Sequence, residues 1–322
     1  MNKKFLIFPL LTTFITSCAE SNVYYNRVFS FFDTTIVAYQ YEGSENYLTK
    51  LNDIYYELNN LTDNYKAHGN GVYELNSDNN VHEISEDLYN ILELALSYKE
   101  SFSGKFNPLV GSLAKKWQES IENKQVLASN IISEEVEKIN NSSLVLSKQD
   151  NKFYAQRIGE AELDLGAISK GYALDKTKEY FDSKELSKFA VNCGASSILL
   201  GKSNETSSDF RVILKDLKNK CFFAQDIFIG TSGVSERGAI IDGVQYSHIV
   251  NPIDGSAINN YDMAYVVGDN GALCDVLSTT FMLSSLDEIR TYETQYNVKT
   301  LLYKNGEIVY LTDGFELENY HG

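Results

Sequence analysis

Apolar residues recur at helical spacing in two segments of the N-terminal half of the chain, which predicts two amphipathic helices. The first segment covers residues 45–61, and its apolar positions are Leu48, Leu51, Tyr55 and Leu58. The second begins after Ser85, a residue suited to cap a helix, and ends near Gly104. Its buried stripe is expected to comprise Leu88, Ile91, Leu92 and Ala95.

Runs rich in β-branched and aromatic residues predict strands. The first run covers residues 28–41 and is interrupted at Asp33-Thr34-Thr35. A hairpin is expected over 301–310, because Asn305-Gly306 suits a type I′ turn. The other expected strands are 190–201, 222–230 and 261–268.

Helices are also expected over 171–181 and 275–284. The polar segment 115–150 is expected to form a helical segment followed by strands. Helices and strands are therefore mixed without strict alternation. This order favours an α+β fold of mixed or antiparallel sheets with packed helices over a doubly wound sheet. Without repeats or a Pro- or Gly-rich linker, residues 28–322 are expected to form one catalytic unit with subdomains.

The N-terminus carries the features of a targeting signal. Lys3 and Lys4 precede an apolar stretch that is short for a membrane span, and Ile15-Thr16-Ser17-Cys18 resembles a bacterial lipobox. We expect residues 1–17 to be a lipoprotein signal peptide and Cys18 to be lipidated, with residues 18–27 as a tether. The expected location is the extracytoplasmic face of the cell membrane. The alternative is an ordinary secretory signal with an incidental cysteine.

The amino-acid composition limits the classes of ligand and partner that the chain can bind. The chain of 322 residues has a formal net charge of −16, which argues against nucleic acid. A phosphate-bearing ligand would need a cation or local backbone dipoles to overcome this field. Beyond Cys18 there are three cysteines, an odd number that forms no complete disulfide framework, and we expect them to be small buried hydrophobes. They are Cys193, Cys221 and Cys274.

Two glycine-containing segments could contact a ligand. Ser103-Gly104-Lys105-Phe106-Asn107-Pro108 offers a cation, an aromatic ring and an amide after a helix end, although a plain turn explains it too. Residues 164–171 place Lys170 before an expected helix, where backbone N–H groups can bind an anion. This second segment is not a Walker motif, and alone it is a weak signal. The segments at 192–195 and 231–237 read as polar turns.

Three further residues could carry chemistry. Asp275 and Thr279 are one helical turn apart, so a carboxylate and a hydroxyl can meet one hard cation such as Mg²⁺. Helix capping or a solvated face is the alternative. His248 titrates near neutrality and could act as a donor or general base near a phosphate, although a structural role is the commoner one.

Taken in order, these segments resemble the motifs of the ApbE family, the FAD:protein FMN transferases, from Phe32 to about Leu283. They are Phe32-Asp33-Thr34, Thr62-Asp63-Asn64-Tyr65, Gly104-Lys105-Phe106-Asn107, residues 164–171, Asn192-Cys193-Gly194-Ala195, residues 232–237, His248-Ile249-Val250-Asn251-Pro252 and residues 274–279. The chain departs from the family pattern in two places. Asn107 replaces the usual Asp, and Ala195 replaces the second Gly.

The resemblance implies a T-fold-related enzyme that binds FAD and Mg²⁺ and transfers FMN to a threonine of an acceptor flavoprotein, releasing AMP. His248 would orient or deprotonate the threonine, and Asp275 would be essential. The implied metal ligands are the Ala167 carbonyl, Asp275 and Thr279. The implied FAD contacts are Phe32, Tyr65, Lys105, Phe106, Asn107, Asp164, Lys170 and Ile249.

Two other functions use the same site. A surface lipoprotein could bind FAD without chemistry, which the departure at Asn107 and the tether would suit. An FAD pyrophosphatase would use water as the nucleophile and release free FMN and AMP. The sequence separates these three poorly, and it does not identify the acceptor.

Overall fold

The structure of the chain, a computed structural model, describes residues 15–16, 25–203, 209–214, 217, 220–235, 237–257 and 259–320. Cys18, the expected lipidation site, lies outside these residues, as does most of the expected signal peptide and tether. Among the described residues, none of the helices has the length and apolar character needed to cross a bilayer.

The helices form where the apolar stripes predict them. In α1, Leu48, Leu51 and Tyr55 are fully buried, and the Ser85 hydroxyl caps α3 by accepting from the Leu88 N–H at 3.2 Å. The helices of the described part are α1 (Leu48–Thr62), α2 (Val72–Ser77), α3 (Glu86–Ser101), α4 (Gly111–Glu122), α5 (Ser129–Asn140), α6 (Ser169–Ser183), α7 (Gly271–Phe281) and α8 (Leu286–Tyr296).

An eight-stranded antiparallel sheet forms the centre of the fold, in the order β16-β15-β14-β11-β8-β7-β3-β2. Its strands are β2 (Tyr25–Phe31), β3 (Thr34–Gln40), β7 (Phe189–Cys193), β8 (Ser197–Leu200), β11 (Ile227–Gly233), β14 (Met263–Gly268), β15 (Lys299–Lys304) and β16 (Glu307–Leu311).

Three smaller sheets complete the described structure. One has the order β1-β9-β10-β17, with β1 (Ile15–Thr16), β9 (Phe210–Leu214), β10 (Lys220–Ala224) and β17 (Glu318–Asn319). A second has the order β4-β6-β5, with β4 (Val81–Ile84), β5 (Ser143–Gln149) and β6 (Lys152–Ile158). The third is the hairpin of β12 (Ala239–Ile241) and β13 (Val244–Tyr246).

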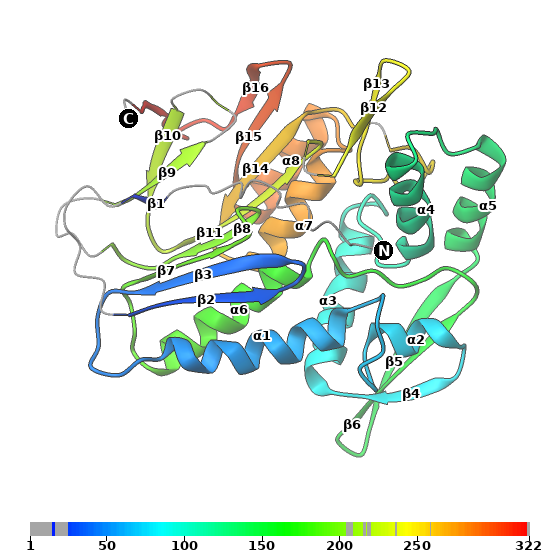
Figure 1. Ribbon diagram of the computed structural model, residues 1–322, viewed down its shortest axis with the longest axis horizontal. Helices are drawn as coiled ribbons and strands as arrows, with labels where there is room; N and C mark the ends of the chain where they lie inside the picture. Colours follow the sequence, from blue (N-terminus) through cyan, green and yellow to red (C-terminus); the bar gives the residue numbers. More distant parts are fainter. Residues whose placement is uncertain are drawn as a thin grey trace, which may run out of the picture.

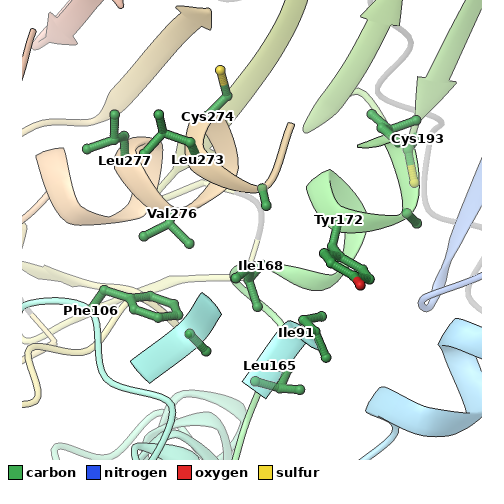
Figure 2. Close-up of a cluster of buried hydrophobic side chains, with 14 of the residues drawn as sticks. Ile91, Phe106, Leu165, Ile168, Tyr172, Cys193, Leu273, Cys274, Val276 and Leu277 are labelled. Carbon is green, nitrogen blue, oxygen red and sulfur yellow. The ribbon is translucent and has the colours of Figure 1, made fainter. Parts of the chain in front are cut away.

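The middle strands of the large sheet are buried on both faces, whereas the edge strand β2 is mostly exposed. Helices α6 and α7 lie along one face, and β9 and β10 lie over the other (Figure 1). Successive side chains of one strand therefore enter different cores: Phe228 joins the helical side, and Ile229 packs with Phe210 on the opposite side. On the helical side, Phe106, Ile168 and Val276 meet beneath α7 (Figure 2).

The α+β fold class is confirmed, and several element boundaries are corrected. The run 28–41 is a hairpin of two strands that starts three residues earlier, at Tyr25. The prediction of single strands over 190–201 and 222–230 is wrong, since each range contains parts of two strands. The turn at Asn305-Gly306 has positive φ at both residues, as a type I′ turn requires. The strands β4, β6, β9, β12, β13 and β17 and the helices α2 and α8 have no counterpart in the prediction.

Candidate active site

The crossing of α6 and α7 brings Asp275 to the start of α6. The Gly171 N–H donates to Oδ2 of Asp275 at 2.7 Å, and the Ser197 hydroxyl donates to the same oxygen at 3.0 Å. Burial raises the pKa of Asp275 to about 6, while the nearby charge of Lys170 acts in the opposite direction. The site therefore contains a buried carboxylate that is expensive to ionise without a cation.

Thr279 lies one turn after Asp275 on the same helix, as predicted. Its hydroxyl is 3.0 Å from the Ser232 hydroxyl, which is also 2.8 Å from that of Ser278. Ser232 is on β11, so these contacts join the helix to the sheet beneath it. The hydroxyl of Thr279 is consequently held in place beside Asp275.

The carbonyl of Ala167 is left free by the way α6 begins. In a regular helix the Gly171 N–H would bond the Ala167 carbonyl, but here that N–H points to Asp275. Within the described part of the chain, no hydrogen bond to this carbonyl is found. A carbonyl, a carboxylate and a hydroxyl are hard oxygen donors of the kind Mg²⁺ accepts while keeping water or phosphate ligands. These donors fit the metal, although the described residues contain no cluster of three His, Cys, Asp or Glu side chains.

Lys170 provides positive charge at the same place. Its positive charge acts to lower the pKa of Asp275, Cys193 and His248, although burial outweighs this effect at Asp275 and Cys193. The lysine is therefore in the electrostatic range of all three side chains. Asp164 shapes the preceding loop, since its Oδ1 accepts from the Gly166 N–H at 2.6 Å.

His248 carries an unsatisfied polar atom. Its Nδ1 is buried and finds no hydrogen-bond partner among the described residues. Burial, together with Arg237 and Lys170, lowers the pKa of His248 to about 4. The imidazole is therefore neutral near pH 7 and retains hydrogen-bonding capacity for a ligand.

Two aromatic residues lie near these groups. Phe32 sits in the β2–β3 turn at φ 53°, an unfavourable conformation for a bulky residue, and its N–H donates to Asn59 Oδ1 at 2.7 Å. Tyr65 is 59% exposed, and the Lys115 ammonium lies 4.8 Å from its ring centre. Asp164 and Arg237 both perturb the pKa of Tyr65, which burial raises, so the ring faces the same region.

The remaining predicted contacts are engaged inside the protein. Lys105 forms an ion pair with Glu288 at 2.5 Å, and Phe106 is 4% exposed in the core beneath α7 (Figure 2). Asn107 Oδ1 accepts from the Leu109 N–H at 3.0 Å, a role that an aspartate would serve equally well. Ile249 is also buried.

Cys193, Cys221 and Cys274 are buried, as predicted, and among the described residues Cys193 and Cys274 form no disulfide bond. Burial raises the pKa of Cys193 to about 12 and that of Cys274 well above its ordinary value, so these two thiols remain protonated.

Sequence reasoning did not single out Ser197 or Asn59. It placed Ser232 and Arg237 in a segment that read as a polar turn and resembled a family motif, but it gave neither residue a role. Glu236 of that segment lies outside the described residues. Ser197 and Asn59 lie outside the motifs. Their roles arise from contacts with residues distant in sequence, which a local pattern does not encode.

The arrangement of sheet and helices is that of a known class of structures, the ApbE flavin transferases. The ApbE protein of Thermotoga maritima superimposes with a TM-score of 0.73 at 20% identity, over 92% of this chain and 96% of that one. The flavin transferase ApbE of Vibrio cholerae gives 0.73 at 19% identity, over 90% and 97%.

The chain belongs to the ApbE family, whose model matches residues 32–302. It is 26% identical over 214 residues to an FAD:protein FMN transferase of Treponema pallidum, covering 61% of this chain and 59% of the relative. A protein of the same description from Klebsiella pneumoniae is 24% identical over 201 residues, covering 61% and 62%. These matches span about three fifths of the relatives' lengths.

Proposed function

We propose that the protein transfers FMN from FAD to a threonine hydroxyl of an acceptor flavoprotein in a Mg²⁺-dependent reaction that releases AMP. The observation that carries this proposal is the group formed by the buried Asp275, the free Ala167 carbonyl and the charge of Lys170 at the α6–α7 crossing. Family membership and the names of the relatives support the same reaction.

The residues that would hold Mg²⁺ are Ala167 through its carbonyl, Asp275 through its carboxylate and Thr279 through its hydroxyl. The bound ion would neutralise pyrophosphate oxygens where negative charge develops during transfer. Gly171 and Ser197 occupy Oδ2 of Asp275 and so orient the carboxylate.

Two side chains of the protein would bind the phosphate groups and accept the proton. Lys170 would bind phosphate oxygens, and His248, neutral near pH 7, would accept the proton of the threonine hydroxyl. The threonine oxygen forms a bond to the FMN phosphorus as the bond from that phosphorus to the bridging oxygen breaks. AMP leaves with the bridging oxygen.

The flavin ring would lie against the exposed aromatic side of the site. Tyr65 is exposed there, with Asp164 in its electrostatic range, and Phe32 is half-buried with its ring against Tyr55. Lys105, Phe106 and Asn107 would contribute mainly by shaping the backbone beside the ring, since their side chains have partners inside the protein. Ile249 would support His248 from the core.

We further propose that Cys18 is lipidated and holds the enzyme at the extracytoplasmic face of the membrane, where it meets its acceptor. In that case Cys18→Ala should leave the full-length precursor unprocessed and without acyl label in its native host. Labelling equal to the wild type would remove Cys18 from this role.

The reaction is tested with the full chain in detergent, FAD, Mg²⁺ and a flavoprotein domain that contains a threonine flavinylation motif. We expect flavin fluorescence on the denatured acceptor, equimolar AMP, and loss of both with EDTA. A Thr→Val acceptor is the control. Free FMN and AMP without acceptor labelling would indicate a pyrophosphatase instead, and stable FAD binding without products would indicate a carrier.

A further inference from the structure

A second carboxylate at the α6–α7 crossing plays no part in the motifs discussed so far. Asp175 lies on α6, one turn after Gly171, and its side chain reaches the beginning of α7. Its Oδ1 accepts from the Gly271 N–H at 2.6 Å, and its Oδ2 accepts from the Ala272 N–H at 2.9 Å. One carboxylate from α6 therefore caps two free amides of α7.

The next amide of α7 is satisfied within its own segment. Asn270 is the local cap residue, and its Oδ1 accepts from the Leu273 N–H at 2.8 Å. The first turn of α7 thus has two caps, one from its own chain segment and one from another helix. Since Asn270 already provides a local cap, the contact from Asp175 fixes where α7 begins relative to α6.

The two helices also touch through their backbones. A Cβ atom on Gly171 would lie 2.1 Å from the Gly271 carbonyl oxygen, and one on Gly271 would lie 2.5 Å from the Gly171 carbonyl oxygen. No side chain can separate the helices at this point. A small slide of α7 along α6 would therefore break the Asp175 contacts and the Gly171–Asp275 hydrogen bond together.

We propose that Asp175 is a positioning residue for the flavin-transfer site: by capping α7 from α6, it holds Asp275 and Thr279 in register with Ala167 and Lys170. The inference rests on the proposed function and deepens it. Asp275 lies one turn after the capped amides and Thr279 two turns after them. The proposed metal ligands thus come from α7 and from the segment that leads into α6, and their separation depends on the register that Asp175 sets.

The test compares Asp175→Asn and Asp175→Ala with the wild type. Asparagine keeps one acceptor but turns an NH₂ group toward the second amide, and alanine removes both acceptors. The matched control is Asp182→Asn, which alters an exposed carboxylate on the same helix that pairs with Lys178. The readout is FAD binding by isothermal titration calorimetry over a range of Mg²⁺ concentrations.

We expect Asp175→Asn to fold and to need at least tenfold more Mg²⁺ for half-maximal FAD binding, with Asp175→Ala shifted further. At saturating Mg²⁺, kcat should return to within about threefold of the wild type, because the residue acts on register and not on the reacting atoms. The Asp182→Asn curve should coincide with that of the wild type.

Unchanged Mg²⁺ dependence in folded variants would overturn the inference, and so would a kcat deficit that saturating Mg²⁺ does not correct. If neither variant folds, the inference also fails, since the carboxylate would then be required for the fold as a whole. A wild type that binds FAD with Mg²⁺ but labels no acceptor would count against the proposed function alone, because the binding curves still report on Asp175.

Discussion

The N–H of Gly171 donates to Oδ2 of Asp275 over 2.7 Å, joining two helices whose contacting residues are 104 positions apart in the chain. The hydrogen bond stabilises the ionised carboxylate, yet burial outweighs it and raises the pKa of Asp275 to about 6. Above that pH the protein without metal carries an ionised group in a position where folding favours the neutral form.

We predict that Asp275→Asn stabilises the metal-free protein while abolishing FMN transfer. An amide oxygen can still accept from Gly171 and Ser197 without the cost of a buried charge. With a pKa of about 6 in the folded state and 3.8 in the unfolded state, this cost reaches about 2 to 3 kcal/mol well above pH 6. Urea unfolding in EDTA measures it.

The gain should be present at pH 8, should shrink as pH falls through 6, and should disappear below about pH 3, where the wild-type carboxyl is neutral in both states. Asp182→Asn is the control and should change stability little at either pH. A variant less stable than the wild type at pH 8, or one that retains full transfer activity, would contradict the prediction.

Local signals account for the elements that the sequence predicted well. The stripe of α1, the Ser85 cap of α3 and the Asn305-Gly306 turn all depend on residues close together in the chain. The segment 192–195 was predicted as a polar turn, and the structure has the β7–β8 turn there, with Ala195 at positive φ. The range 190–201 was still predicted as one strand, because its apolar residues continue on both sides of that turn. The start of α8 was missed although Ser285 and Glu288 form a capping box.

For the site, the sequence predicted motifs but not which side chains face the ligand. Phe106 follows a glycine turn, as a ligand-contacting residue could, but packs beneath α7 because the core needs a large apolar group there. The contacts of Ser197 and Asp175 could be recognised only from the packing of α6 on α7. Such contacts depend on tertiary geometry and have no local periodicity.

The turn at Ala195 leads to a second prediction. Ala195 has φ 63°, where an L-residue with a Cβ is strained by about 1 kcal/mol. Ala195→Gly should therefore raise the free energy of unfolding by about 1 kcal/mol while keeping the bond from its N–H to Asn192 Oδ1 at 2.7 Å. Thermal and urea unfolding provide the measurement. Ala190→Gly, in strand β7, is the control and should destabilise; equal effects of the two variants would refute the explanation.

His248 leads to a prediction about pH. Its pKa is about 4 in the folded protein and 6.5 as a free side chain, so between these values the unfolded chain binds a proton that the folded protein does not. Stability from this residue is therefore lost as pH falls from 6.5 toward 4. Between pH 7 and pH 5 the wild type should lose about 2 kcal/mol more than His248→Asn.

Urea unfolding at the two pH values measures this difference. His82→Asn is the control: it alters a histidine on strand β4 that pairs with Asp78 at 2.9 Å, and it should leave the loss of stability between pH 7 and pH 5 in place. Parallel profiles for the wild type and His248→Asn would show that the imidazole is not held neutral.

The contact between Asn59 and Phe32 allows the flavin end of the site to be tested separately from the metal end. Asn59 on α1 accepts the Phe32 N–H at 2.7 Å and so stabilises a turn in which Phe32 has φ 53°. Without this contact the strained turn should relax and the ring should lose its fixed orientation. We expect Asn59→Ala to weaken FAD binding about tenfold, which corresponds to a loss of about 1.4 kcal/mol.

The Mg²⁺ concentration for half-maximal FAD binding should remain within about twofold of the wild type, because the hydrogen bonds found for the Asn59 side chain within the described part of the chain go to Phe32 and Asn60 and not to α6 or α7. Calorimetric titration of FAD at saturating Mg²⁺, and of Mg²⁺ at fixed FAD, separates the two effects. Asn52→Ala, which alters an exposed amide on the same helix, is the matched control. An altered Mg²⁺ requirement with unaltered FAD affinity would mean that the β2–β3 turn serves the metal end of the site, and that Phe32 does not position the flavin.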